Sequence, residues 1–241
     1  MMPYDSKNAL GLTNALFHNF IKNFISCFKA SYLPLHLVAI ALTVFLVLSG
    51  ADWQFYQTTS KSGIGKYFFS SLVIGALFPI LMPIFLLFFG MLKRSKILII
   101  VASTIIQAAI LGLLLSFFYK SLTGRVPPDL FGIYESIDIS RKFRFGFLEG
   151  GVFWGWPSSH TSVAFAVSVA IMNLFPKHKI IRAIALLFAF YIGIGVAIIG
   201  AHWLSDFLAA IIYGSIVGFI VGKSYSKLLI DTRLQTEANF E

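Results

Sequence analysis

Charged residues are scarce in this chain of 241 residues, and cysteine is almost absent. Asp, Glu, Lys and Arg make up 12% of the sequence, about half their share in a typical soluble domain, whereas hydrophobic residues make up 58%. This composition excludes a soluble globular domain and predicts a protein embedded in a membrane. The single cysteine, Cys27, excludes an internal disulfide and a cysteine-based metal cluster.

Long uncharged runs supply the elements that this composition requires. A transmembrane helix needs about 20 predominantly apolar residues. Six runs reach or approach that length, the two shorter ones by extension through His160 or Asp206: 33–51, 68–92, 97–119, 161–175, 183–201 and 207–222. The sequence therefore predicts an all-α fold, a polytopic bundle of six transmembrane helices in a single integral-membrane domain over residues 1–241.

The segment before the first run has a different pattern. Phe and Ile recur at helical spacing between residues 17 and 28, with Lys and Asn at positions between them. Residues 1–30 are therefore expected to form an interfacial segment with an N-terminal amphipathic helix. That helix either lies in the membrane surface or packs as a cap on the bundle.

The distribution of basic residues predicts the orientation. With six spans, 12 of the 19 Lys and Arg residues lie on the side that holds both termini, and five of the other seven lie in the 120–159 loop. Because positive charge is enriched on the cytoplasmic side, we expect cytoplasmic termini and an external 120–159 loop. The net charge of +9 is assigned to contacts with membrane lipids, since no nucleic-acid motif accompanies it and no nucleic-acid partner is expected.

Three polar clusters fall on the expected external side. The first, KSLTGRVPPD, follows the third run and contains Lys120 and Arg125. An arginine fork and a lysine point charge can together hold a dianionic phosphate. A basic pair that extends from the membrane boundary towards water would explain the same residues without a ligand.

The second cluster, WPSSHT, occupies residues 156–161 at the start of the fourth run. Hydroxyl groups and free backbone N–H groups of Ser158 and Ser159 at a helix N-terminus can bind an anion, and His160 can act as a general acid or base. The alternative is a simple helix N-cap with an interfacial histidine.

The third cluster, GAHWLSD, places His202 and Asp206 four residues apart on one helical face. The carboxylate can hold the imidazole in one tautomer and strengthen it as a nucleophile. A pair that only stabilises the end of a helix has the same spacing.

In their order and spacing, the three clusters resemble the type 2 phosphatidic acid phosphatase superfamily of integral membrane phosphatases. The family pattern is a Lys-containing segment ending in Arg-Pro, then Pro-Ser-Gly-His, then Ser-Arg, five residues, His, three residues and Asp; here KSLTGRVPPD, PSSH and GVAIIGAHWLSD stand in its place. The resemblance covers residues 97–222. It implies a lipid phosphatase that acts on a lipid phosphate in the bilayer through a phosphohistidine, with no metal ion and no cofactor.

The resemblance also implies a role for each motif residue. His202 resembles the nucleophile, with Asp206 as its orienting partner. His160 resembles the acid that protonates the leaving oxygen and then serves as the base for water. The groups that resemble phosphate-binding residues are Lys120, Arg125, Ser158 and the backbone N–H near Ser159.

Two arginines of the family pattern are absent. Pro127 stands in place of the second arginine of the first motif, and Val196 in place of the arginine six residues before the nucleophilic histidine. Losing two such cations would cost on the order of several kcal/mol of transition-state stabilisation unless other groups replace them. The candidate replacements on the external loop are Arg141, Lys142 and Arg144.

The sequence thus predicts a metal-independent lipid phosphatase of a bacterial inner membrane, active on the periplasmic face. Its expected substrate is a phosphate monoester or pyrophosphate of lipid A, phosphatidylglycerol phosphate or undecaprenyl pyrophosphate type. Lipid A is preferred because the external loop is basic. The alternatives are a lipid phosphotransferase or head-group transferase of the same fold, and a non-catalytic lipid-binding or transport protein.

Overall fold

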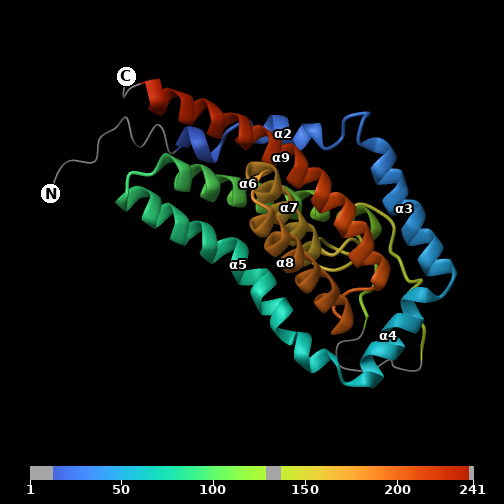
Figure 1. Cartoon of the computed structure of the whole chain (residues 1–241). Helices are drawn as coiled ribbons and strands as arrows, with labels where there is room; N and C mark the ends of the chain where they lie inside the picture. Colours follow the sequence, from blue (N-terminus) through green and yellow to red (C-terminus); the bar gives the residue numbers. More distant parts are fainter. Residues whose placement is uncertain (1–12, 129–136, 239–241) are drawn as a thin grey trace.

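A computed structural model describes residues 13–128 and 137–238 of the chain (Figure 1). Its helices, in chain order, are α2 (Phe20–Ser26), α3 (Leu33–Leu48), α4 (Ala51–Ser62), α5 (Gly65–Leu92), α6 (Lys96–Thr123), α7 (Ser159–Leu174), α8 (Lys179–Ile198) and α9 (Leu204–Ala238). No β-strand occurs within these residues. The prediction of an all-α fold is confirmed.

The number of complete membrane spans is smaller than the predicted six. Four helices, α5, α6, α8 and α9, are long and apolar enough to cross a membrane, and α3 with α4 makes a fifth if this bent pair counts as one span. The pair bends by 68°, and Gly50 between the two helices has a φ of +76°, a left-handed conformation that glycine adopts readily. The first predicted span therefore ends three residues early, and the chain continues as the more polar α4.

The other discrepancy is α7. This helix has 16 residues and is about 24 Å long, which is less than the hydrocarbon thickness of about 30 Å. It packs against α6, α8 and α9, and most of its side chains are buried. Its apolar composition thus serves contacts within the protein, a distinction that hydropathy along the sequence does not make.

Glycines allow α7 and α9 to approach closely. Gly214, Gly218 and Gly222 recur every four residues and so line one face of α9. A Cβ atom added at Gly218 would lie 2.5 Å from the carbonyl oxygen of Ala166, and one at Gly222 would lie 2.7 Å from that of Ala170. Residue numbers rise together along this contact, so the two helices run parallel and their N-termini lie at the same end of the bundle.

The N-terminal segment packs on the bundle, which is one of the two alternatives expected for it. Helix α2 lies beside α9 (Figure 1). Its buried Asn23 donates a hydrogen bond of 2.6 Å to Gln107 of α6. The aromatic side chains that pack on the core are Phe20, Phe24 and Phe28. The apolar side chains that remain exposed on this segment are Phe17, Ile21 and Ile25.

Candidate active site

The three sequence clusters meet at the end of the bundle where α7 and α9 begin. The backbone N–H of Ser158, just before α7, donates to the backbone carbonyl of Asp206 in the first turn of α9 at 3.2 Å. The C-terminal end of α6 brings Lys120 and Arg125 to the same place. The parallel packing of α7 and α9 therefore converts three separate motifs into one site.

His202 and Asp206 form a buried pair. Nδ1 of His202 lies 3.2 Å from Oδ2 of Asp206, which also accepts the backbone N–H of Trp203 at 3.2 Å. Because an ionised carboxylate only accepts hydrogen bonds, the imidazole proton resides on Nδ1 and the lone pair on Nε2. Burial lowers the pKa of His202 below its ordinary value, and the hydrogen bond with Asp206 opposes this shift only in part. The imidazole is therefore a neutral nucleophile at neutral pH.

Arg125 is buried against Asp206. Its guanidinium makes five hydrogen bonds, as many as it has N–H groups. Two reach the carbonyl oxygen of Ser140 at 3.2 and 2.8 Å, and one reaches Oγ of Ser205 at 2.7 Å. The other two reach the carboxylates of Asp52 at 2.6 Å and Asp206 at 2.5 Å. In this arrangement no N–H group of Arg125 is left for a phosphate oxygen.

Asp52, in the first turn of α4, is a buried residue of the candidate site that sequence reasoning missed. It is fully buried, and its Oδ1 accepts the backbone N–H of Ser205 at 2.8 Å. Its Oδ2 accepts from the hydroxyl of Ser205 and from Arg125, both at 2.6 Å. Asp52 thus caps the N-terminus of α9 from another helix. A lone carboxylate next to the first apolar run was the signal, since such a group at a membrane boundary is usually functional.

His160 is the second residue of α7 and faces α5. A Cβ atom added at Gly75 of α5 would lie 3.3 Å from Cδ2 of His160, so the helix backbone passes close to the imidazole. Among the described residues the ring of His160 has no hydrogen-bond partner, and it is close enough to His202 and Lys120 to interact electrostatically with both. Its nitrogens are free to meet a ligand.

Ser158 is the N-cap of α7, as the structural alternative for this cluster proposed. Its buried hydroxyl accepts the backbone N–H of Thr161 at 3.4 Å and the hydroxyl of Thr161 at 3.0 Å. The Ser159 hydroxyl pairs with that of Ser116 at 3.0 Å. The first-turn backbone N–H groups of Ser159 and His160 have no intrahelical acceptor, as is usual at a helix N-terminus. They remain the candidate anion-binding groups of this turn.

Lys120, in the last turn of α6, is a buried cation that still has N–H groups available for a phosphate. Its Nζ donates to the backbone carbonyl of Phe153 at 3.0 Å. An ammonium group has three N–H donors, and within the described residues only this one is used. Lys120 also interacts electrostatically with His202 and Asp206.

Within the described residues, no other cation contacts the site in place of either absent arginine. Val196 is fully buried, and its carbonyl accepts the backbone N–H groups of Ala201 and His202 at 3.0 and 3.3 Å. The three basic residues of the 141–144 segment are exposed, and within the described residues none makes a hydrogen bond or ion pair with a predicted site residue. The guanidinium of Arg141 instead donates to the carbonyl of Leu48 at 3.3 Å.

An apolar cavity of about 450 Å³ lies between α5, α6 and α7. Most of its wall is aliphatic, and its side chains include Pro79, Ile80, Pro83, Ile106, Ile110 and Leu113. The polar residues in its lining are Ser159 and His160. His160, one of the two candidate catalytic histidines, therefore borders a hydrophobic space between helices.

Within the described residues, no group of three or more His, Cys, Asp or Glu side chains is placed to hold a metal ion. No curated protein sequence matches the chain. Among solved structures, the chain is similar to the crystal structure of the first transmembrane PAP2 type phosphatidylglycerolphosphate phosphatase from Bacillus subtilis, with 17% identity and a TM-score of 0.38 over 86% of this chain and 92% of that one.

The sequence profile of the PAP2 superfamily matches residues 96–229, which is more than half of the chain and includes all three clusters. The match confirms the resemblance drawn from the motifs. The chain belongs to the PAP2 superfamily of membrane phosphatases.

Proposed function

We propose that this protein removes phosphate from a membrane lipid through a covalent phosphohistidine at His202. The observation that carries the proposal is the buried pair of His202 and Asp206, whose 3.2 Å hydrogen bond leaves Nε2 of the imidazole free to attack. The pair lies at one end of the helix bundle, where a lipid can reach it from the bilayer, so this chemistry needs no soluble substrate domain.

The proposed reaction has two steps, formation and hydrolysis of the phosphohistidine. In the first, Nε2 of His202 attacks phosphorus, the bond from phosphorus to the lipid oxygen breaks, and His160 gives a proton to that oxygen. Because burial lowers the pKa of His160 to about 4, His160 carries this proton only when the anionic phosphate is bound beside it. In the second, His160 takes a proton from water, whose oxygen attacks phosphorus and breaks the N–P bond. Inorganic phosphate leaves and both histidines return to their starting states.

The phosphoryl oxygens are stabilised by Lys120 and by the start of α7. Backbone N–H groups at a helix N-terminus carry partial positive charge and bind anions. The corresponding end of α9 is already occupied by the carboxylates of Asp52 and Asp206. Helix α7 is therefore the one that presents free N–H groups, those of Ser159 and His160, to the substrate.

Arg125 has a different role from the one the motif resemblance implied. Its donors bind Asp52, Ser205, Ser140 and Asp206, so we assign it to positioning Asp206. The Arg125 charge also keeps Asp206 ionised, which a hydrogen-bond acceptor for His202 must be. The phosphate then depends on Lys120 as its principal protein cation.

The aliphatic cavity between α5, α6 and α7 supports a lipid as the substrate. An acyl chain in this cavity would place its head group near His160, and it could enter from the bilayer between helices. The positive-inside pattern supports a site on the periplasmic face of a bacterial inner membrane. Single cysteines at Glu149 and Lys177 in a Cys27→Ser background test this with an impermeant thiol reagent on intact cells; labelling of 177 alone would reverse the orientation.

Product analysis with the purified protein in detergent tests the function. Lipid A, phosphatidylglycerol phosphate and undecaprenyl pyrophosphate are compared as substrates, with release of inorganic phosphate as the readout. We expect release from at least one, and none from His202→Ala. A phosphorylated acceptor lipid without free phosphate would identify the transferase that the absent arginine at Val196 favours. No reaction with any of the three would refute the proposal.

A further inference from the structure

A second cavity, which is polar, lies at the other end of α9, far from the candidate active site. It has a volume of about 620 Å³ and is formed by α2, the connection from α2 to α3, and the C-terminal half of α9. Lys223 in its wall follows Asp206 by 17 residues, which is about 26 Å along the helix axis. In a membrane this separation places the candidate active site and the polar cavity towards opposite surfaces.

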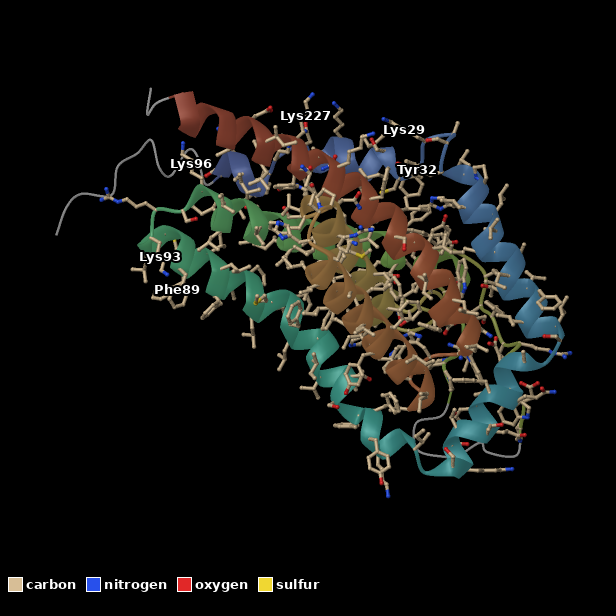
Figure 2. All side chains as sticks on the ribbon, in the orientation of Figure 1. Lys29, Tyr32, Phe89, Lys93, Lys96 and Lys227 are labelled. Carbon is tan, nitrogen blue, oxygen red and sulfur yellow. The ribbon has the colours of Figure 1, made fainter. Side chains whose placement is uncertain are left out.

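The charge of this cavity is strongly positive. Four lysines line it, two from the α2 side and two from α9, against a single carboxylate, Asp231; they are Lys22, Lys29, Lys223 and Lys227. Figure 2 shows Lys29 and Lys227 with Tyr32 along α9, away from Lys93 and Lys96 at the turn between α5 and α6. All four lysines are exposed, and within the described residues none forms an ion pair. An anion between them would relieve their mutual repulsion.

The two walls are held together by a buried polar network. Asn23 of α2 donates to Oε1 of Gln107 at 2.6 Å, and Nε2 of Gln107 donates to the hydroxyl of Tyr225 in α9 at 3.1 Å. The amide of Asn19 donates to Oγ of Ser224 at 3.3 Å. These bonds join α2, α6 and α9. The two lysines on the α2 side are consequently held opposite those of α9.

The surroundings indicate the depth at which the cavity meets the membrane. Phe17, Ile21 and Ile25 are exposed apolar side chains on the same segment that carries Lys22 and Lys29. Such side chains insert into the boundary between head groups and acyl chains. The basic cavity beside them therefore lies at the level of lipid head groups.

We propose that this cavity binds the phosphate-bearing head group of an anionic phospholipid, at the membrane surface opposite the active site. The lysines supply the attraction for the phosphate, the amides and hydroxyls of the wall supply neutral donors, and the exposed apolar residues accompany the acyl chains. The site is independent of the phosphatase chemistry, since it shares no residue with the His202 site.

Binding to the full chain in neutral detergent tests this proposal, with phosphatidylglycerol, phosphatidylcholine and inorganic phosphate as probes. The double variant Lys22→Gln/Lys223→Gln removes one cation from each wall. Lys93→Gln/Lys96→Gln is the matched control, because it removes two exposed lysines that lie outside the cavity (Figure 2). Native mass spectrometry measures retained lipid, and the shift in thermal unfolding measures affinity. Circular dichroism and size-exclusion chromatography verify that both variants are folded.

We expect phosphatidylglycerol, and neither of the other two probes, to bind the wild type and the control. The double variant in the cavity should bind it about 10-fold or more weakly, because it loses two of the four cations that attract the phosphate. Asp231→Asn, which raises the net charge of the cavity, should tighten binding. Equal losses in both double variants would show a general surface effect and overturn the proposal. Equal stabilisation by inorganic phosphate would overturn the lipid as ligand, and no phosphatidylglycerol bound to the wild type would overturn the site itself.

Discussion

Replacing Asp52 with asparagine will destabilise the protein and slow the reaction, although Asp52 does not contact the proposed substrate. The substitution keeps the size of the side chain but removes one of the two carboxylates that balance the buried Arg125. Breaking one partner of a buried ion pair costs about 3 to 5 kcal/mol. Asparagine retains an acceptor for the Ser205 backbone N–H, so we expect the lower end, about 3 kcal/mol, or a decrease in Tm of roughly 6 to 12 °C.

The effect on catalysis follows from the shared guanidinium. With Asp52 neutral, Arg125 is drawn towards Asp206, and the hydrogen bond that His202 donates to Asp206 is weakened. We expect kcat to decrease by about 10-fold or more with little change in KM, because the substrate is bound by Lys120, the start of α7 and the apolar cavity, and not by Asp52.

Thermal unfolding in detergent and phosphate release at saturating substrate measure the two effects. Asp138→Asn is the control, because Asp138 is an exposed carboxylate in the neighbouring loop that contacts Ser140 but not Arg125. A Tm and kcat for Asp52→Asn that equal those of the control would refute the positioning network.

Three further predictions follow from the packing and the protonation state of the site. Gly218→Ala places a Cβ atom 2.5 Å from the Ala166 carbonyl, so α7 and α9 must separate; we expect a loss of about 1 to 3 kcal/mol in thermal unfolding, and an unchanged Tm would contradict the close contact. Val196→Arg buries an unpaired cation and will lower stability by on the order of 3 to 5 kcal/mol without raising kcat; higher activity would mean that the pocket has room for the family arginine. Burial holds the pKa of His202 below its ordinary value of 6.5, so the imidazole stays neutral and nucleophilic as pH falls through 6.5. The substrate p-nitrophenyl phosphate isolates this effect, because its leaving group needs no acid. After correction for substrate ionisation, we expect kcat/KM to fall on the acid side with a midpoint below pH 6.5, and a midpoint above 6.5 would contradict the shift.

Local geometry explains which parts of the site were predictable. His202 and Asp206 are four residues apart, so any helix that contains them brings the two side chains together. The N-cap role of Ser158 is equally local, and was one of the two interpretations of its motif. The family pattern then joined motifs that no local rule connects.

Contacts between distant segments were not predictable from spacing. Asp52 meets Ser205 across 153 residues of sequence, and only the fold shows that α4 ends up beside the start of α9. Arg125 has the same sequence signature whether it binds a phosphate or two carboxylates. The glycine repeat of α9 was visible in the sequence, but its meaning depends on which helix faces it.

The number of spans illustrates a different difficulty. Hydropathy reports how apolar a segment is and not whether lipid or protein covers it. Helix α7 is apolar because α6, α8 and α9 enclose it, so it resembles a membrane span without having the length of one. The 33–51 run likewise shows no sign in its hydropathy of the turn at Gly50.

Trapping the covalent intermediate tests the central claim most directly. The purified protein is mixed with a lipid labelled in its terminal phosphate, quenched within one turnover in alkali, where phosphohistidine survives, and digested for mass spectrometry. The account predicts one labelled site, on His202, that is absent from His202→Ala. Turnover by the wild type with no label on His202, together with retained activity in His202→Ala, would contradict it.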